Sequence, residues 1–149
     1  MSILFINGSP NHHGNTASLA AALLKDKKYE TLNLTEYTIG AYGQQLPGDG
    51  LDAVVAAMEK ANTIVIGSPL YWHNICGSVR NVLDRFYGRV QNGGLSGRKL
   101  YFVFQGAAPE KWMLEAGEYT MKRFAVLYGM SYGGMATNKA EAEKLNKTL

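Results

Sequence analysis

Residues 3–16 read ILFINGSPNHHGNT, and this stretch decides the fold class. An uninterrupted apolar run that ends in a glycine turn is typical of a strand buried on both faces of a parallel sheet. After the loop, from Asn15 onward, apolar residues recur at helical spacing, with Leu19 and Leu23 on one stripe. The stretch therefore predicts a strand, a loop and a helix, which together form the first unit of an α/β fold.

The same alternation continues along the chain. Strands are predicted at residues 2–7, 29–34, 62–67, 99–105 and 130–135. Helices are predicted at 15–28, 49–61, 77–87 and 112–128 and in the lysine-rich tail, with a loop at 35–48. This order indicates a parallel sheet with helices on both faces. Because ligands bind beyond the carboxyl ends of such strands, the loops after the first, third and fourth strands are the candidate site.

Composition limits the classes of protein to which the chain can belong. With 149 residues, 46% apolar and 18% charged, it is expected to form one globular domain over residues 1–149. No apolar stretch reaches the roughly 18 residues of a membrane span, and no secretory signal is recognisable, so we expect a cytoplasmic protein. The one cysteine, Cys76, suits a reducing compartment, and we interpret it as a small core residue. A net charge of +3 is too small to indicate nucleic-acid binding.

The first loop has the features of an anion site. Gly8 and Gly14 permit tight backbone paths, while Ser9, Asn15 and Thr16 place donors around the start of the following helix. Free N–H groups and the positive end of the helix dipole favour a mononucleotide phosphate. The alternative is a capped turn, with Asn15 or Thr16 as the N-cap, that binds no ligand. The loop lacks the lysine of a P-loop and has no dinucleotide-binding glycine motif.

The loop after the third predicted strand, SPLYWHN at residues 68–74, carries aromatic side chains. Flat apolar walls beside backbone amides at a strand end suit a flat heteroaromatic ring. The alternative is that Tyr71 and Trp72 pack in the core or at a subunit interface.

Two segments together, GSPNHHGNT at 8–16 and SPLYWHNICGSVRNVLDRFYGR at 68–89, resemble the flavodoxin-like NAD(P)H-dependent FMN reductase and quinone reductase family. The resemblance implies a three-layer α/β sandwich around a five-stranded parallel sheet of order 2-1-3-4-5. It also implies that residues 9–16 hold the FMN phosphate, that 69–72 edge the isoalloxazine and that 105–106 close its far side. The FMN-binding residues implied are Ser9, Asn15, Thr16, Pro69, Leu70, Tyr71, Trp72, Gln105 and Gly106. Asp84 and Arg85 look structural, as a salt bridge that braces their helix.

The chain departs from the family pattern in the first loop. A basic residue commonly follows Ser-Pro, whereas here Asn11, His12 and His13 occupy the stretch. The simplest interpretation of His12 and His13 is that they are solvated loop residues. The alternative is that one of them, taken as His13, hydrogen-bonds the phosphate when protonated, and that His73 hydrogen-bonds the flavin edge. A metal site is not expected, because a metal would need further ligands.

The activity implied by the resemblance is hydride transfer from NADH or NADPH, through bound FMN, to a small acceptor such as a quinone or a flavin. No side chain is needed as a catalytic acid or base, since the cofactor carries the chemistry. A flavodoxin-type electron carrier and a non-catalytic flavin-binding module remain as alternatives. Flavodoxins are generally acidic, so the charge of +3 favours the reductase.

Large amphipathic side chains predict self-association. The chain has more large amphipathic side chains than one small sheet needs to cover its faces. These residues are Trp72, Tyr87, Trp112, Met113 and Tyr128. We expect a homodimer in which residues 71–72 or 111–113 approach the partner's flavin. The alternative is a monomer with these aromatic side chains in its own core.

Overall fold

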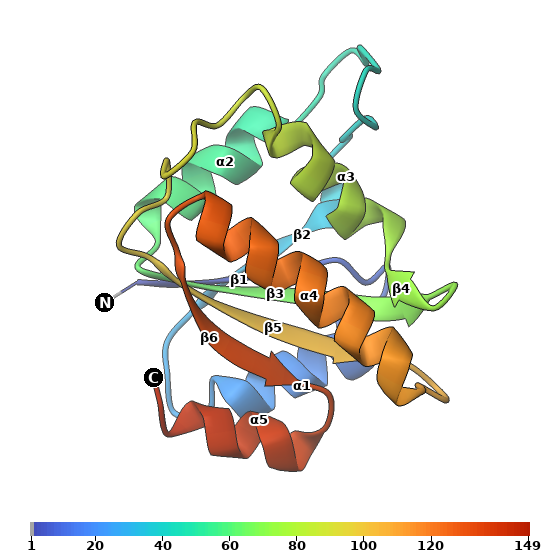
Figure 1. Cartoon of the computed structure of the whole chain (residues 1–149), viewed down its shortest axis with the longest axis vertical. Coiled ribbons are helices and arrows are strands. Elements are labelled where there is room, and N and C mark those ends of the chain that lie inside the picture. The colour runs from blue at the N-terminus through green and yellow to red at the C-terminus, as the bar shows by residue number, and fades with distance from the viewer. Residues whose placement is uncertain (1) are drawn as a thin grey trace.

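The computed structural model describes residues 2–149. Figure 1 shows a sheet between two layers of helices, with α2, α3 and α4 on one face and α1 and α5 on the other. The helices are α1 (Asn15–Leu23), α2 (Leu51–Lys60), α3 (Gly77–Phe86), α4 (Lys111–Leu127) and α5 (Lys139–Asn146), with a 3-10 turn η1 (Leu34–Glu36). None of the helices in residues 2–149 is both long and apolar enough to cross a bilayer.

Five parallel strands form the sheet in the order β2-β1-β3-β5-β6. They are β1 (Ile3–Asn7), β2 (Glu30–Asn33), β3 (Thr63–Tyr71), β5 (Lys99–Gln105) and β6 (Ser131–Ala136). Numbered among themselves, these strands have the predicted order 2-1-3-4-5, so the flavodoxin-like fold class is confirmed. An additional strand, β4 (Asn74–Ile75), pairs antiparallel with the end of β3.

The apolar strands are buried because both faces of the sheet are covered. Leu4 and Ile64 belong to the cluster under α2, α3 and α4, whereas Phe5 and Val65 belong to the cluster under α1 and α5. Successive side chains of a strand point to opposite faces, so a central strand must be apolar throughout. This explains why the sequence shows continuous apolar runs there.

Two predicted boundaries were wrong. The first helix ends at Leu23 instead of residue 28, because Asp26 adopts a left-handed conformation (φ 64°) through which a right-handed helix cannot continue. The third strand continues to Tyr71 instead of residue 67, and its end is extended by pairing with β4. The stretch SPLYWHN is therefore mostly strand and hairpin turn. The remaining boundaries agree to within one or two residues.

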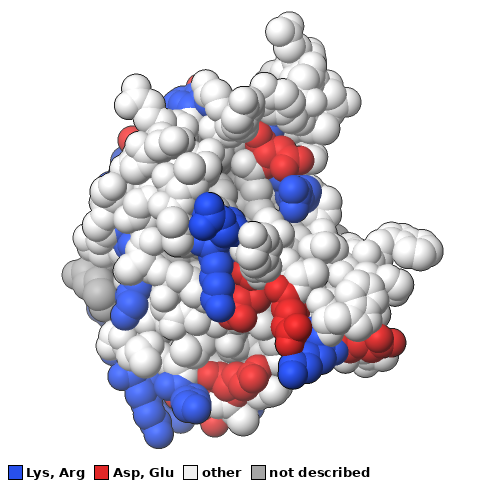
Figure 2. Space-filling model, viewed as in Figure 1, with Lys and Arg blue, Asp and Glu red and all other residues white. Residues whose placement is uncertain are grey.

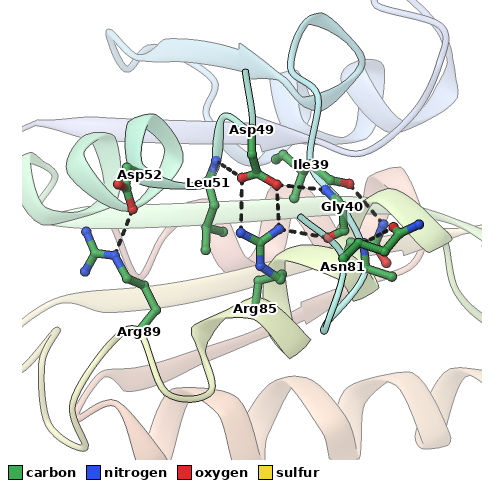
Figure 3. Close-up of polar contacts among 10 residues, drawn as sticks. Ile39, Gly40, Asp49, Leu51, Asp52, Asn81, Arg85 and Arg89 are labelled. Carbon is green, nitrogen blue, oxygen red and sulfur yellow. Dashed lines mark hydrogen bonds and ion pairs between the residues drawn. The ribbon is translucent and has the colours of Figure 1, made fainter. Parts of the chain in front are cut away.

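An ion pair anchors the long loop at residues 37–50, as Figure 3 shows. Arg85 donates from both terminal nitrogens to Asp49, at 2.6 and 3.1 Å, and also donates to the Gly40 carbonyl at 3.1 Å. The Asp49 carboxylate further accepts the backbone N–H groups of Gly40 and Leu51. Hydrogen bonding by Arg85, with help from these N–H groups, holds the pKa of Asp49 well below its usual range. Arg85 is therefore structural, as predicted.

The predicted salt bridge between Asp84 and Arg85 was wrong, because adjacent residues of a helix do not face each other. Asp84 instead accepts a hydrogen bond from Arg80 at 3.2 Å along the exposed side of α3. The stabilising contact of Arg85 joins α3 to a loop 36 residues earlier in the chain.

Candidate functional site

The loop after β1 is fixed in place by close backbone packing. The Gly8 N–H donates to the Gly67 carbonyl at 2.8 Å. A Cβ atom at Gly8 would overlap the side chain of Val79 and lie 2.9 Å from that same carbonyl oxygen. Only glycine fits here, so the start of the loop is held against β3 directly after the end of β1.

The residues that follow organise the loop through short side-chain contacts to the backbone. The Ser9 N–H donates to Asn7 Oδ1 at 3.0 Å, and the Asn11 N–H donates to Ser9 Oγ at 3.1 Å. The His13 N–H then donates to Asn11 Oδ1 at 3.0 Å. Asx and Ser turns of this kind hold a loop in one conformation without regular structure. The loop is therefore preformed.

The start of α1 carries unsatisfied donors. Gly14 is the N-cap, so the expectation of Asn15 or Thr16 as the cap was wrong, and no side chain caps this helix. Within residues 2–149, the N–H groups of Asn15, Thr16 and Ala17 have no acceptor. Three free N–H groups and the positive end of the helix dipole are the features that allow a helix start to bind an anion. These donors fit a phosphate group.

The two histidines of the loop lie in different surroundings. His12 Nε2 is 2.8 Å from the Thr35 hydroxyl, and its Nδ1 is 3.8 Å from Glu36, so this ring contacts η1. The His13 side chain is exposed and makes no side-chain hydrogen bond among the residues described. A contact between His13 and a phosphate stays a prediction.

Contacts between distant residues bring the three predicted loops together. Ser78, at the start of α3, donates its hydroxyl to the Gly8 carbonyl at 2.8 Å. Gln105, at the end of β5, donates to the buried hydroxyl of Thr16 at 3.1 Å. A Cβ atom at Gly106 would lie 3.0 Å from Cβ of Leu70, so these two backbones run side by side. One site therefore combines the anion loop with the ends of β3 and β5.

Cys76 lies behind this site and does not face it. Its side chain is buried, its N–H donates to Ser68 Oγ at 2.9 Å, and its sulfur is 3.6 Å from the Gly8 carbonyl oxygen. The expectation of a small core residue is confirmed. Among residues 2–149 there is no group of three or more His, Cys, Asp or Glu side chains placed to hold a metal ion.

A strained turn joins β3 to β4. Trp72 (φ 48°) and His73 (φ 66°) are both left-handed, and the flanking pairs are Leu70 with Ile75 and Tyr71 with Asn74. Two-residue hairpin turns with positive φ at both positions normally use Asn-Gly, because side chains with a Cβ cost about 1–2 kcal/mol per residue there. A bulky residue that favours β-strands, such as Trp72, is not expected at a position with positive φ. The hairpin was missed because the sequence lacks this turn signal.

The side chains of the turn gather beside α4. Trp72 is 94% exposed and Tyr71 49% exposed, which excludes the alternative in which they belong to the core. The centroid of the His73 ring lies 6.5 Å from that of Trp72 and 5.5 Å from that of Trp112, both edge to face. Trp112 in turn donates its indole N–H to Glu110 at 2.6 Å. In Figure 1 the hairpin projects past the end of the sheet, next to the start of α4.

The chain belongs to the family described as NADPH-dependent FMN reductase, which matches residues 1–142. An iron-sulfur flavoprotein from Archaeoglobus fulgidus is 34% identical over 98 residues, which cover 57% of this chain and 48% of that protein. The chain thus spans about half the length of this curated relative.

Solved structures agree on the fold. The Trp repressor binding protein from Bacillus subtilis has a TM-score of 0.79 at 19% identity, over 97% of this chain and 98% of that one. An FMN-dependent NADH-azoreductase from Bacillus anthracis, solved with FMN, has a TM-score of 0.68 at 16% identity, over 99% and 95% of the two chains. At such low identity these likenesses concern the fold alone.

Proposed function

We propose that this chain is an FMN-dependent oxidoreductase that transfers hydride from NADH or NADPH, through FMN, to a small acceptor such as a quinone or a flavin. The observation that carries the proposal is the preformed anion site at the start of α1, where three N–H groups lack acceptors among residues 2–149. Membership in the FMN reductase family supports the same ligand. We further propose that residues 1–149 act as a single domain and work in the cytoplasm.

The phosphate of FMN would occupy the first loop. In this proposal the residues that hold it are Ser9, His13, Asn15 and Thr16. Thr16 is suited to the task because its hydroxyl oxygen already accepts from Gln105, so its own hydrogen is free to donate to a phosphate oxygen. The loop contains no lysine or arginine, and the helix end supplies the positive potential instead.

The isoalloxazine would lie between the ends of β3 and β5. The residues proposed to border it are Pro69, Leu70, Tyr71, Trp72, His73, Gln105 and Gly106. Leu70 and Gly106 run side by side, so a ring placed over them meets one continuous surface. When held by these residues, FMN would supply the chemistry of hydride transfer between the nicotinamide and the acceptor. The balanced reaction with a quinone is NAD(P)H + H⁺ + quinone → NAD(P)⁺ + hydroquinone.

The protein's own contribution in this scheme is binding and orientation. The contacts Ser78 to Gly8 and Gln105 to Thr16 fix the three loops relative to one another, so the phosphate and the ring are held by one rigid frame. No side chain is assigned as a catalytic acid or base.

We also propose a homodimer formed through the face between α3 and α4. A groove of about 600 Å³ lies there, lined in part by Tyr42, Tyr87 and Leu127, which are largely exposed. The rings of Tyr42 and Tyr87 meet edge to face at 5.7 Å. An exposed aromatic surface on a protein of this size commonly marks an interface. Of the residues named from the sequence, Met113 and Tyr128 are buried within the chain and are not available for contact. The approach of residues 71–72 or 111–112 to a partner's flavin stays a prediction.

The decisive experiment compares FMN with riboflavin, which lacks the phosphate. Thr16→Ala should weaken FMN binding by about 1–3 kcal/mol, the cost of removing a hydrogen bond to a charged group, and leave riboflavin almost unchanged. Thr16→Ser keeps the hydroxyl and serves as the matched control. Fluorescence titration measures the dissociation constants of both ligands for the wild type and for the two variants. Equal weakening of both ligands would contradict the phosphate assignment.

A separate assay tests the activity. The protein reconstituted with FMN should oxidise NADH or NADPH in the presence of a quinone, followed at the nicotinamide absorbance. Tight FMN binding without oxidation of either nucleotide would instead favour an electron carrier or a non-catalytic flavin-binding module.

A further inference from the structure

The positively charged side chains of this protein fall into two groups. Within residues 2–149, six of the 15 Lys and Arg residues form ion pairs with carboxylates, namely Arg80, Arg85, Arg89, Lys111, Lys122 and Lys139. Nine form no ion pair there, and eight of these nine share one end of the molecule. The eight are called here the basic surface: Lys25, Lys27, Lys28, Lys60, Arg98, Lys99, Lys144 and Lys147.

Hydrogen bonds bring three segments of the basic surface together. The side chain of Asn146, at the end of α5, donates to the carbonyls of Leu23 and Lys25 at 2.9 and 3.0 Å. Lys99, the first residue of β5, donates to the Thr148 carbonyl at 3.2 Å. The ends of α1 and α5 therefore lie beside the start of β5.

The remaining segment adjoins the same edge of the sheet. Arg98 donates to the carbonyl of Glu59, at the end of α2, and Lys60 follows directly. Lys28 and Lys60 line one groove, which runs along the start of β1. The basic surface thus covers the edge at which the parallel strands begin, whereas the candidate site lies at the edge at which they end. The seven residues of β5 separate the two edges by about 20 Å.

The net charge of +3 conceals an uneven distribution. Three side-chain carboxylates, those of Asp26, Glu30 and Glu59, accompany the eight cations of the basic surface. The rest of the chain carries seven cations and nine carboxylates, so it is slightly negative. Figure 2 shows blue side chains gathered at the lower left, where α5 ends in Figure 1. One end of the molecule is therefore strongly positive.

Helix dipoles explain only part of this surface. Lys60 and Lys144 lie in the last turns of α2 and α5, where a cation is favourable. Lys28, Arg98 and Lys99 precede or begin strands, so no helix end accounts for them. Like charges that are gathered on one surface repel one another, and an anionic partner would remove that repulsion.

The kinds of residue present select the partner. Seven of the eight cations are lysines, and the Arg98 guanidinium already donates to the carbonyls of Ser96 and Glu59. Interfaces with other proteins are depleted of lysine and enriched in aromatic residues and arginine. Of the segments that carry the cations, only 25–30 contains a large exposed apolar side chain, that of Tyr29. Flexible lysines without aromatic anchors suit the headgroups of a membrane that contains anionic lipids.

We propose that the basic surface docks the protein peripherally on an anionic membrane surface. The strand starts then face the lipid headgroups, and the candidate site at the opposite edge faces the solution. The contact is electrostatic and reversible, and no part of the chain enters the bilayer. The proposal goes beyond the proposed function, because it holds whether or not the protein reduces an acceptor.

Co-sedimentation with vesicles tests the proposal, and it uses the protein without FMN. Phosphatidylcholine vesicles that contain about 30% phosphatidylserine should bind the protein at low ionic strength, whereas pure phosphatidylcholine vesicles should not. Binding should be lost in about 0.5 M NaCl, because salt screens the charges. Absence of binding to the anionic vesicles at low ionic strength, or equal binding to both kinds of vesicle, would overturn the proposal.

A charge-matched pair of variants assigns the binding to this surface. Each lysine near an anionic membrane raises binding about fivefold, so Lys28→Gln/Lys147→Gln should weaken it at least tenfold. The control, Arg89→Gln/Lys122→Gln, changes the net charge equally but elsewhere and should stay within twofold. An equal loss in the control would show that only the net charge matters and would refute the assignment.

A second variant protects the test against a failure of folding. Lys60→Gln/Lys144→Gln removes two other cations of the basic surface and should also weaken binding at least tenfold. Circular dichroism identifies any variant that does not fold. Retention of full vesicle binding by a folded variant of either pair would overturn the proposal.

The two tryptophans report the orientation of the bound protein. Trp72 and Trp112 both lie at the candidate-site end, and both are exposed. Lipids with a spin-labelled headgroup quench fluorescence at short range, so they should leave the emission of the bound protein unchanged. Strong quenching would show that the opposite end faces the bilayer. Tighter binding to polyglutamate or to duplex DNA than to the anionic vesicles, at the same ionic strength, would assign the surface to an acidic protein or to nucleic acid and would refute the membrane.

Discussion

The loop at 37–50 and the β3–β4 hairpin both project from the body of the fold, and they are held there in opposite ways. In the loop, the Asp49 carboxylate accepts from Arg85 and from the N–H groups of Gly40 and Leu51. In the hairpin, backbone pairing and the contact of His73 with Trp112 set the position, while Trp72 and His73 adopt strained conformations and leave their rings exposed.

The difference separates structural groups from groups available for binding. The one charged group of the loop, the Asp49 carboxylate, is engaged by Arg85 of α3 and by two backbone N–H groups, so it contributes stability. The hairpin is destabilised by its own left-handed side chains, which stay exposed. Polar groups that are satisfied internally indicate a structural role, and strained, exposed ones indicate a binding role.

The largest effect should come from breaking the anchor of the loop. Arg85→Met removes every donor of the guanidinium, leaves the mostly buried Asp49 carboxylate short of partners, and should lower the free energy of unfolding by about 2–3 kcal/mol. Urea denaturation measures the change. The control is Arg89→Met, which removes the exposed pair with Asp52 seen in Figure 3 and should cost less than about 0.5 kcal/mol. Equal costs for the two variants would refute the distinction between the pairs.

The second effect is a dependence of stability on pH. Because folding lowers the pKa of Asp49, the stabilisation is complete above the ordinary aspartate pKa of about 3.9 and is lost as the pH falls below it towards the folded pKa. Between pH 5 and pH 3 the free energy of unfolding should fall by about 1 kcal/mol more in the wild type than in Asp49→Asn. Parallel stability curves for the two proteins over that range would show that Asp49 is not the titrating group.

The smallest effect concerns the turn, and it has the opposite sign. Trp72→Asn/His73→Gly should raise the free energy of unfolding by about 1 kcal/mol, because it relieves two left-handed side chains. In the loop the corresponding change is Gly48→Ala, at a φ of 70°. An added Cβ would meet no atom within 4 Å, so only the cost of the left-handed backbone remains. This change should lower the free energy of unfolding by about 1 kcal/mol. Thermal denaturation distinguishes the two signs. A destabilised double variant would mean that the rings support the fold.

Much of the fold could be predicted from the sequence because it depends on local periodicity. Continuous apolar runs identified the parallel strands, and glycine followed by polar residues identified the loop around Ser9 and Thr16. The pairing of Arg85 with Asp49 could not be predicted, since nothing local relates residues 36 positions apart, and neither could the contact of Gln105 with Thr16.

The candidate site was only partly predictable for a different reason. The order of the strands selected three loops, and the structure brings Thr16, Gln105, Gly106 and Leu70 of these loops together. The conformation of the Trp72–His73 turn was missed because tertiary pairing with β4 overrides the local preference of these residues. The adjacent histidines looked equivalent in the sequence, yet only His12 contacts η1.

The outermost strands of the sheet determine how the protein can avoid aggregation. The pairing of β6 with β5 contains an irregularity. Leu100 of β5 pairs with Tyr132, whereas the next residue, Tyr101, pairs with Gly134, which has a φ of 135°. The opposite outer strand, β2, has four residues. A bulged strand and a very short one are poor templates for the addition of a strand from another molecule. Edge-to-edge growth of the sheet into fibrils is therefore disfavoured at both outer strands.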